Sequence, residues 1–190
     1  MIKTENISIN EVVKCHLVVF PKSIYNLFGI DVLKKTFLWY MMGKSDRNII
    51  VYEHSPKVVG FLTMRMTGDT ESFWHYIGQT LFFSFLKRPW LILNHKILCK
   101  AYEMLVANNL SITSNKMELI SLGIHPDYQN KGIGKKLLEK CEDISKSLLC
   151  NQLQLYVKKN NINAIEYFYN CGWVNANISN TKYFLLIKGI

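Results

Sequence analysis

The stretch HPDYQNKGIG, residues 125–134, lies where a strand-like run gives way to a helix-like one. The apolar run ELISLGI (118–124) precedes it, and KKLLEKCEDISKSL (135–148), with apolar residues at helical spacing, follows it. A helix N-terminus presents unpaired backbone N–H groups and a partial positive charge, so it binds anions readily. Gly132 and Gly134 would let a diphosphate approach the backbone without meeting a Cβ atom. The stretch therefore predicts a phosphate-binding loop, with a plain tight turn as the alternative.

Two common nucleotide-binding loops do not fit this spacing. A Walker A loop requires G-x-x-x-x-G-K-[S/T], but Gln129 stands at the first glycine and Lys136 at the hydroxyl position. A dinucleotide-binding loop requires G-x-G-x-x-G, but Leu137 replaces the third glycine. Both of these nucleotide-binding loops are therefore excluded, and a tight turn without a ligand stays the alternative to a phosphate-binding loop.

The composition indicates a globular chain with an excess of positive charge. Of its 190 residues 49% are hydrophobic and 19% are charged, which suits one packed domain rather than a disordered chain. The net charge of +9 favours an anionic partner such as a nucleotide, a nucleic acid, an acidic sugar or a membrane surface. The 20 lysines against 3 arginines are also typical of proteins from AT-rich genomes, so the charge leaves both explanations open.

Cysteine and histidine are too scattered to predict a metal site. The cysteines include no C-x-x-C pair and no spacing suited to zinc; they are Cys15, Cys99, Cys141, Cys150 and Cys171. The first ten residues are polar and lack the apolar core of a signal peptide. We therefore expect no metal, and a reducing, cytoplasmic setting.

One segment, residues 77–99, is apolar enough to suggest membrane contact. Lys87, Arg88 and Pro89 divide it into two pieces, each too short to span a bilayer, which takes about 20 apolar residues. The segment is predicted to be a buried helical hairpin, with an interfacial helix at a membrane surface as the alternative. It belongs to an aromatic-rich stretch, 67–115, that is interpreted as two or three helices.

The rest of the chain alternates between helix and strand periodicity. Ser8 and Glu11 have the spacing of a capping box and predict a helix that ends before Pro21. A second helix is expected from Asp31 and is closed by Gly43. Strands are expected at 47–53, 58–66, 117–124, 153–159 and 182–188, and helices at 131–148 and 161–172. The chain is therefore expected to form one α/β domain, residues 1–190.

Two motifs in the C-terminal half resemble signatures of one family. QNKGIG (129–134) matches Q/R-x-x-G-x-G/A, and NNINAIEYFYNCGW (160–173) is similar to N-x-x-A-x-x-x-Y-x-x-x-G-F/W. Both are motifs of the GCN5-related N-acetyltransferases (GNAT); the match covers residues 117–175, and the 47–66 hairpin fits the family's second and third strands. The resemblance implies a single GNAT-like α/β domain with flanking helices and a mixed central sheet of about six to seven strands. It also implies splayed fourth and fifth strands, with a helical insert at about 67–115 between the third and fourth.

The resemblance further implies acetyl-CoA, or another acyl-CoA, as the diphosphate ligand and co-substrate. A strand backbone would pair with its pantetheine arm, the loop amides would hold its pyrophosphate, and the last helix would also contact it. By position these residues are Leu122, Gly123 and Ile124 for the arm, Gln129, Asn130, Lys131, Gly132, Ile133, Gly134 and Lys135 for the pyrophosphate, and Asn161 and Phe168 for the helix. A glycine inside a strand often marks a bulge or a close backbone approach, which favours Gly123 in this role.

Acyl transfer to an amine needs a base, because a lysine-like amine has a pKa of about 10.4 and must lose a proton. Glu118 is the candidate, since it begins the strand on which several members of the family keep their base. Strict alternation places it on one face with Ile120, Leu122 and Ile124. The alternative is an exposed strand-end glutamate with no catalytic role.

Phe168 departs from the family pattern. The resemblance puts it where the family has a tyrosine that protonates the leaving thiolate, which phenylalanine cannot do. Tyr167 and Tyr169 flank it, each turned by about 100° around the helix. Tyr169 is taken as the candidate acid, and Tyr156 and Tyr183 on neighbouring strands are further candidates. A thiol of pKa about 8.5 leaves as thiolate at pH 7 at a cost of about 2 kcal/mol, so slower rather than absent activity is expected.

The acceptor is predicted to be a primary amine of a small molecule. The opening half, CHLVVFPKSIYNLFGIDVLKKTFLWYM (15–41), loosely resembles family members from bacterial surface-polysaccharide gene clusters, which favours an amino sugar. The alternatives are a protein or peptide amine, or an acyl-CoA-binding protein with little or no catalysis, which Phe168 would permit. A nucleic-acid-binding module would explain the charge, but no RNP-type, helix-turn-helix or zinc pattern supports it. The 67–115 insert could shape an acceptor pocket, a homodimer surface or a peripheral membrane contact.

Overall fold

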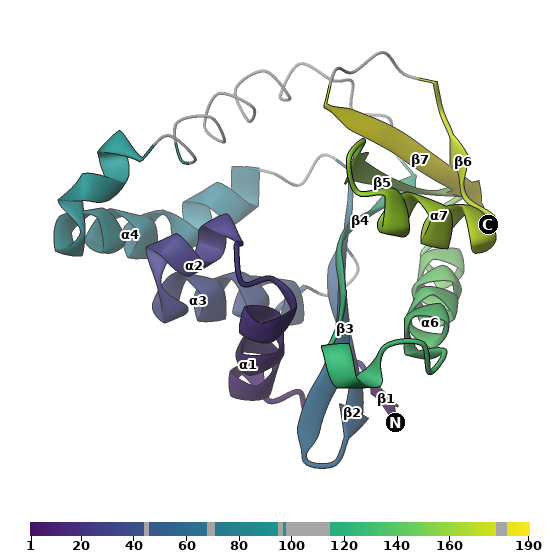
Figure 1. The fold of residues 1–190 in the computed structure, drawn as a ribbon, viewed down its shortest axis with the longest axis horizontal. Coiled ribbons are helices and arrows are strands. Elements are labelled where there is room, and N and C mark those ends of the chain that lie inside the picture. The colour runs from purple at the N-terminus through teal and green to yellow at the C-terminus, as the bar shows by residue number, and fades with distance from the viewer. Residues whose placement is uncertain (44–45, 68–70, 95–96, 98–114, 178–181) are drawn as a thin grey trace.

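A seven-stranded mixed sheet with helices on both faces forms the body of the computed structural model (Figure 1). The structure describes residues 1–43, 46–67, 71–94, 97, 115–177 and 182–190. The strands, in the order β1-β2-β3-β4-β5-β7-β6 across the sheet, are β1 (Ile2–Lys3), β2 (Arg47–His54), β3 (Lys57–Met66), β4 (Lys116–Ile124), β5 (Gln152–Lys158), β6 (Val174–Asn175) and β7 (Tyr183–Gly189). β4 and β5 are parallel and the other described pairs are antiparallel, which confirms the expected mixed α/β sheet.

The helices form two layers that lie on opposite faces of the sheet. One face is covered by α6 and α7, and the other by the N-terminal helices (Figure 1). The helices are α1 (Ile9–Val19), α2 (Ile24–Phe28), α3 (Ile30–Met41), α4 (Glu71–Lys87), α6 (Ile133–Ser147) and α7 (Ile162–Asn170), with short 3-10 turns η1 (Pro89–Leu93) and η2 (Pro126–Tyr128).

The central hairpin of β2 and β3 is apolar on both sides because both faces of the sheet are covered. On β3, Phe61 packs into the cluster beneath α1 and α3, whereas Leu62 packs into the cluster beneath α6 and α7. Both side chains are fully buried. Burying a side chain of this size stabilises the fold by about 1.5–3 kcal/mol. The continuous apolar runs of the sequence therefore supply two cores, one on each side of the same strand.

A β-bulge in β4 changes which side chains share a face. Thr63 pairs with Ser121 and the next residue of β3, Met64, pairs with Leu119, which leaves Ile120 as the extra residue. The expected grouping of Glu118 with Ile120, Leu122 and Ile124 is therefore wrong. Met117 and Leu119 before the bulge, and Leu122 and Ile124 after it, all pack toward α6, while Glu118, Ser121 and Gly123 face α1 and α3.

Helices α1 and α3 lie where they are predicted, but their ends differ from the prediction, and the short helix α2 between them is not predicted. α1 begins after Ser8, yet the Ser8 side chain makes no capping hydrogen bond, and Glu11 instead pairs with Lys14 at 2.6 Å. The C-cap of α3 is Met42 in a right-handed conformation, so Gly43 does not close the helix in a left-handed turn. Helix length follows from the apolar period, whereas the choice of cap depends on side-chain geometry that the period does not determine.

The described part of the 77–99 segment is not a buried hairpin. α4 buries Phe73, Ile77 and Ser84, and the segment continues through Arg88 into η1. Large apolar side chains of the segment remain exposed: Phe82, Phe83, Leu86, Trp90 and Leu93. The prediction of burial therefore holds for only part of the described segment, namely one stripe of α4 together with Leu91 and Ile97. Residues 98–114, the rest of the predicted helical insert, lie outside the described residues.

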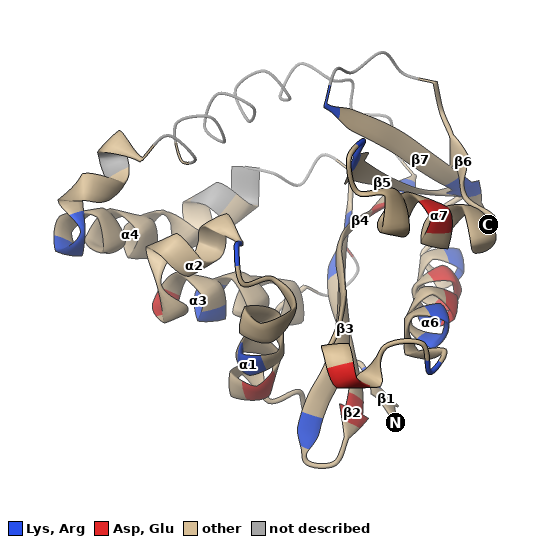
Figure 2. Ribbon diagram, in the orientation of Figure 1, with Lys and Arg blue, Asp and Glu red and all other residues tan. Residues whose placement is uncertain are grey.

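No helix within the described ranges is long and apolar enough to cross a membrane. The charged residues are spread over several elements: Figure 2 shows Lys and Arg on α1, α3, α4 and α6, mixed with Asp and Glu. One ion pair ties β7 to α6 through Lys188 and Glu142, whose charged atoms are 2.6 Å apart. In this view the charges form no single basic stripe of the sort that follows a nucleic-acid backbone.

Candidate active site

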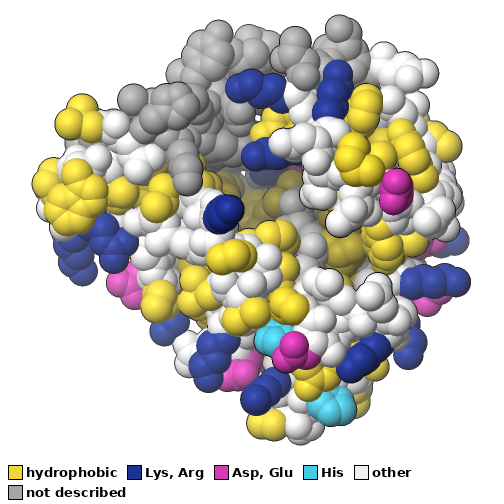
Figure 3. Space-filling model, in the orientation of Figure 1, with side chains coloured by type: hydrophobic (Ala, Val, Ile, Leu, Met, Phe, Trp, Pro, Cys, Tyr) yellow, Lys and Arg dark blue, Asp and Glu magenta, His cyan; other side chains and the backbone are white. Residues whose placement is uncertain are grey.

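An opening between β4 and β5 is the feature on which the site is built. The two parallel strands pair only from Lys116–Gln152 to Glu118–Gln154, while β4 stays paired with β3 as far as Ile124. The strands therefore part after Glu118, which confirms the predicted splay. Figure 3 shows the surface hollowed in this region, with hydrophobic side chains on the floor of the hollow. The edge of β4 that faces the opening carries Leu122, Gly123 and Ile124.

Gly123 lies in a tightly packed place on the helix side of this edge. A Cβ atom there would lie 2.9 Å from Phe61, 3.0 Å from Phe20 and 3.0 Å from Val19. The bulge of β4 lies at Ile120 and not at Gly123. The end of α1 can therefore press against β4 at this point, which brings the N-terminal layer up to the opening.

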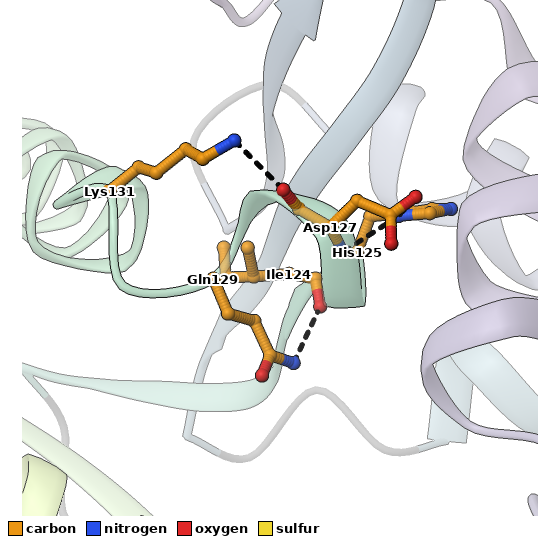
Figure 4. A network of polar contacts seen from close by, with 5 residues as sticks. All are labelled: Ile124, His125, Asp127, Gln129 and Lys131. Carbon is orange, nitrogen blue, oxygen red and sulfur yellow. Dashed lines mark hydrogen bonds and ion pairs between the residues drawn. The ribbon is translucent and has the colours of Figure 1, made fainter.

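The loop from Gln129 to Lys135 leads from the open end of β4 into α6. Figure 4 shows how it is held: the Gln129 side-chain amide donates to the Ile124 carbonyl at 3.2 Å, and Lys131 Nζ donates to the Asp127 carbonyl at 2.9 Å. The Gln129 backbone N–H donates to the Pro126 carbonyl, so this residue shapes the loop with both groups. Asn130, with a φ of 58°, adopts the left-handed conformation, which Asn tolerates better than most residues.

Gly132 and Gly134 serve different purposes in this loop. Gly132 caps α6 with a φ of 72°, a conformation that L side chains rarely adopt, and a Cβ there would meet open space. Gly134 is crowded instead, because a Cβ there would lie 2.5 Å from the Tyr167 hydroxyl of α7. That hydroxyl oxygen is buried and has no hydrogen-bond partner among the described residues.

These features fit a diphosphate group. Ile133, Gly134 and Lys135 form the first turn of α6, where backbone N–H groups have no intrahelical acceptor. The approach is open at Gly132, and the unpartnered hydroxyl of Tyr167 adds a donor at the same helix end. A helix N-terminus with these donors attracts negative charge. The loop therefore has the shape and polarity for a pyrophosphate, while the β4 edge beyond it offers backbone groups to an extended chain.

Glu118 stands at the point where β4 and β5 part, and it is paired rather than free. Its Oε2 accepts from Arg65 Nη2 at 3.0 Å and from Arg65 Nε at 3.1 Å. Both side chains are mostly buried, with 14% of Glu118 and 18% of Arg65 exposed. The expected alternative of an exposed strand-end glutamate therefore does not describe this residue. A paired, mostly buried carboxylate beside an opening is a feature of catalytic sites as well as of structural ion pairs.

Hydroxyl groups gather around this ion pair on the α1–α3 face. The Thr63 and Ser121 hydroxyls lie 2.6 Å apart. Burial raises the pKa of Tyr40 on α3, and the neighbouring charges of Arg65 and Glu118 act on it in opposite directions. Burial likewise raises the pKa of Tyr25 on α2, against the effect of Arg65. At neutral pH both phenols are therefore protonated and can donate hydrogen bonds.

Sequence reasoning missed Arg65, Tyr25 and Tyr40. The one signal available was Arg65 itself, a cation inside the otherwise apolar strand VVGFLTMRM, since a charged side chain in such a strand usually has a partner. The partner, Glu118, is 53 residues away along the chain. Pairing at that distance depends on the β3–β4 register, which the sequence pattern does not specify.

The last helix places its three named residues differently. Asn161 is exposed at the N-cap of α7 and its side chain makes no capping hydrogen bond. Phe168 is only 7% exposed and packs edge-on against Trp173 and Tyr167, so it is a core residue. Tyr169 is 44% exposed on α7, on the α6 side of the sheet, whereas Glu118 faces α1 and α3. The fold does not bring the two predicted catalytic residues to the same face.

A separate cavity of about 460 Å³ lies on the β2 side of the loop. Its lining comes from β2, η2 and the loop, and consists of Tyr52, His54, Asp127, Tyr128, Lys131 and Ile133. The Lys131 ammonium lies 4.9 Å from the centre of the Tyr128 ring, so this side chain is directed toward η2. Lys131 and Ile133 of this lining also belong to the glycine loop, whereas β4 and β5 contribute no residue to it. Within the described ranges, no group of three or more His, Cys, Asp or Glu residues could hold a metal ion.

The splayed strands and the glycine loop define a class of α/β proteins that can hold an extended diphosphate ligand at a strand opening. A model of the acetyltransferase (GNAT) family matches residues 20–173, and the chain therefore belongs to that family. This membership confirms the resemblance of the two motifs to the family. The family match also covers more of the chain than the motifs do, because it begins at residue 20, at the end of α1.

Known proteins with similar sequence or fold agree with this membership. A spermidine N(1)-acetyltransferase of Thermoplasma acidophilum is 38% identical over 64 residues, a match that spans 34% of this chain and only 40% of the relative. The solved structure of PaiA N-acetyltransferase from Thermoplasma acidophilum, in complex with coenzyme A, aligns over 100% of this chain and 99% of its own at 16% identity, with a TM-score of 0.62. The ribosomal-protein-S18-alanine N-acetyltransferase of Escherichia coli aligns over 100% of this chain and 93% of its own at 15% identity, with a TM-score of 0.58. The two structures support the fold alone.

Proposed function

We propose that this protein is an N-acetyltransferase that moves an acetyl group from acetyl-CoA to a primary amine. The observation that carries the proposal is the parting of β4 and β5 at Glu118. It puts a mostly buried carboxylate at the base of an opening whose far end leads into the glycine loop of α6. One site therefore offers donors for a diphosphate, an unpaired strand edge and a base.

Each part of this site has a role in the proposal. The amides of the first turn of α6 and the Tyr167 hydroxyl hold the pyrophosphate, and the β4 edge at Leu122–Ile124 pairs with the pantetheine arm. Glu118 takes the proton that the amine loses, and Arg65 positions its carboxylate through two hydrogen bonds. Asn161, exposed at the start of α7, is available to the cofactor, while Phe168 supports α7 from the core.

The acceptor is proposed to be an amino sugar rather than a polyamine. The chain carries a net charge of +9, which disfavours the approach of a polycation and favours acceptors that are neutral overall or bear an anionic group. The hydroxyls of Thr63, Ser121, Tyr25 and Tyr40 near Glu118 suit an acceptor that is itself rich in hydroxyl groups. A nucleotide-linked amino sugar meets both conditions.

The test is transfer from acetyl-CoA, measured as release of the CoA thiol, with a panel of amines. The panel contains an amino sugar, its nucleotide-linked form, spermidine and a peptide with a free N-terminus. We expect the amino sugars to raise thiol release most above the hydrolysis rate. Higher turnover with spermidine or with the peptide would replace the proposed acceptor and retain the enzyme class.

A matched pair of variants tests the base. Glu118→Gln should lower kcat by about 10²–10⁴, because a general base contributes about that much, and should leave CoA affinity unchanged. Glu142→Gln is the control, since Glu142 is also a mostly buried, ion-paired carboxylate but lies on α6 beside Lys188. Equal losses in the two variants would assign Glu118 a structural role only.

A CoA-binding protein without catalysis is the second candidate, favoured by the burial of Phe168 where the family resemblance implies a proton donor. Binding of CoA by calorimetry, with no amine raising thiol release above hydrolysis, would select this candidate. Absence of CoA binding would exclude both.

A further inference from the structure

Tyr156 occupies a distinctive place beside the opening. The last paired residues of the parallel strands are Glu118 on β4 and Gln154 on β5, and successive residues of a strand alternate between its faces. Tyr156 is therefore the first side chain beyond the last pair that shares a face of β5 with Gln154. Its neighbours Leu155 and Val157 are buried toward α6 and α7, whereas Tyr156 is 42% exposed.

Glu118 and Tyr156 consequently lie on the same face of the sheet. Glu118 is on β4 and Tyr156 is on β5, so the two strands that border the opening carry one of them each. The two are close enough for the Glu118 charge to act on the phenol: burial, and then this negative charge, raise the pKa of Tyr156. A phenol with a raised pKa stays protonated at neutral pH and can donate a hydrogen bond. Other titratable or charged groups near this face are Arg65 on β3, Tyr25 on α2, Tyr40 on α3 and Lys158 further along β5.

The other tyrosines considered for proton donation are less well placed. Tyr183 on β7 pairs with Lys158, so it is one strand further from β4 than Tyr156 and two residues further along. Tyr169 is exposed on α7, on the other side of the sheet. The Tyr167 hydroxyl is directed at Gly134 in the loop. Tyr156 alone among these residues borders the β4–β5 opening on the Glu118 face.

We propose that Tyr156 donates a proton to the sulfur that leaves during acetyl transfer, an inference that rests on the proposed function. The amine nitrogen forms a bond to the acetyl carbonyl carbon, and the bond from that carbon to sulfur breaks with its electron pair on sulfur. Tyr156 gives its hydroxyl proton to the sulfur, and Glu118 takes the proton that the nitrogen loses. The phenolate then regains a proton from Glu118 through water, which restores both groups and leaves an amide and a free thiol.

A first experiment needs no acceptor. CoA labelled with carbon-13 next to sulfur is bound to the protein, and the pKa of its thiol is read by NMR across a pH series. A hydrogen bond to the thiolate favours the charged form, so Tyr156→Phe should raise the thiol pKa by about one unit relative to the wild type. Tyr183→Phe should leave it at the wild-type value.

A second experiment uses whichever amine proves active, and expects Tyr156→Phe to lower kcat by about 10²-fold, within the usual range for a general acid, with CoA affinity unchanged. Equal thiol pKa values, or equal kcat values, in the wild type and Tyr156→Phe would overturn the inference while leaving the acetyltransferase intact. Failure of the wild type to bind CoA by calorimetry would overturn the proposed function itself. A shift with Tyr183→Phe and none with Tyr156→Phe would transfer the role to β7.

Discussion

The two faces of the sheet differ in what their cores contain. Among the described residues, Ser145 is the buried polar side chain beneath α6 and α7, and its hydroxyl donates to the Cys141 carbonyl within α6; further polar groups of that side lie at the rim, in the glycine loop. Beneath α1 and α3 the apolar cluster surrounds buried polar side chains, among them His16 and Thr63, and it borders the Glu118–Arg65 pair. One face therefore has the glycine loop at its edge, and the other surrounds His16 with its apolar cluster and borders the ion pair.

In the proposed function, this difference divides the two substrates between the layers. The α6 side carries the loop that is proposed to hold the diphosphate, which runs from Ile124 to Gly134, with the Tyr167 hydroxyl of α7 beside it. The α1–α3 side carries Glu118, the proposed base, and its neighbours, which come from α2, α3, β3 and β4. A binding site of the first kind can be recognised from one stretch of chain. A site of the second kind exists only once distant segments have met.

The largest expected effect tests whether the two layers unfold together. Phe61→Ala removes a fully buried ring that contacts His16, Phe20 and Phe37, and should lower the free energy of unfolding by about 3–5 kcal/mol. Leu62→Ala, at the next residue, removes a buried side chain from the cluster beneath α6 and α7 and should lower the free energy of unfolding by about 2–5 kcal/mol. Urea unfolding should give a single transition in both variants. Two separate transitions in either one would mean that the layers are independent.

The next effect is a pH dependence that belongs to the α1–α3 side. Burial lowers the pKa of His16 to about 4, and neither ring nitrogen has a hydrogen-bond partner among the described residues. Because the unfolded chain binds the proton more readily, stability is retained above about pH 6.5 and falls by up to about 3 kcal/mol as the pH drops toward 4. His16→Phe should remove this slope in urea titrations, whereas replacement of the exposed His75 by Gln should keep it. An unchanged slope in His16→Phe would assign the acid sensitivity to other groups.

A smaller effect belongs to the loop. Gly134→Ala places a Cβ 2.5 Å from the Tyr167 hydroxyl, and the resulting overpacking should cost about 1–3 kcal/mol and weaken CoA binding. Adding Tyr167→Phe should recover part of the stability, since the clashing atom is gone. Gly78→Ala on α4 is the control: it meets open space and should stabilise the helix by about 1 kcal/mol. Thermal melts measure the stability of each variant and calorimetry measures its CoA affinity. If Gly134→Ala has the stability and CoA affinity of the wild type, the loop has room for a Cβ atom at this position.

The smallest effect concerns two helix starts in the N-terminal layer. The Ser23 hydroxyl accepts from the Tyr25 N–H at 3.3 Å, so Ser23→Ala should cost about 0.5–1 kcal/mol. Ser8 makes no such bond, so Ser8→Ala should stay within about 0.5 kcal/mol of the wild type. The ordering of the two unfolding free energies is the measurement. A larger loss at Ser8 would mean that the capping box suggested by Ser8 and Glu11 forms in solution.

The sequence was informative wherever the structure depends on neighbouring residues. The β2–β3 hairpin, the extent of α6 and the position of the glycine loop all follow from local period and turn chemistry. The bulge at Ile120 does not, because it is fixed by how β4 pairs with β3. The strict alternation assumed for β4 therefore put Leu122 and Ile124 on the wrong face.

Apolar composition was also a poor guide to burial in α4. Phe82, Phe83 and Leu86 are as hydrophobic as Phe73 and Ile77, yet only the latter two are buried. Hydrophobicity states a preference for burial, but the neighbouring helices cover only one stripe of a helix. Likewise, the motif position of Phe168 predicts a cofactor contact, whereas its packing against Trp173 is visible only in the fold.

The extra residue at Ile120 has a consequence for which changes β4 can accept. Before it, odd-numbered side chains point toward α6; after it, even-numbered ones do. Any side chain of moderate size can occupy position 120 itself, because that position is exposed. Deleting Ile120 would move each later side chain of β4 to the opposite face of the sheet. Leu122 and Ile124 would then point away from α6, and the chain would enter the glycine loop with its side chains reversed. The length of β4 between Glu118 and the glycine loop is therefore more tightly constrained than the identity of residue 120.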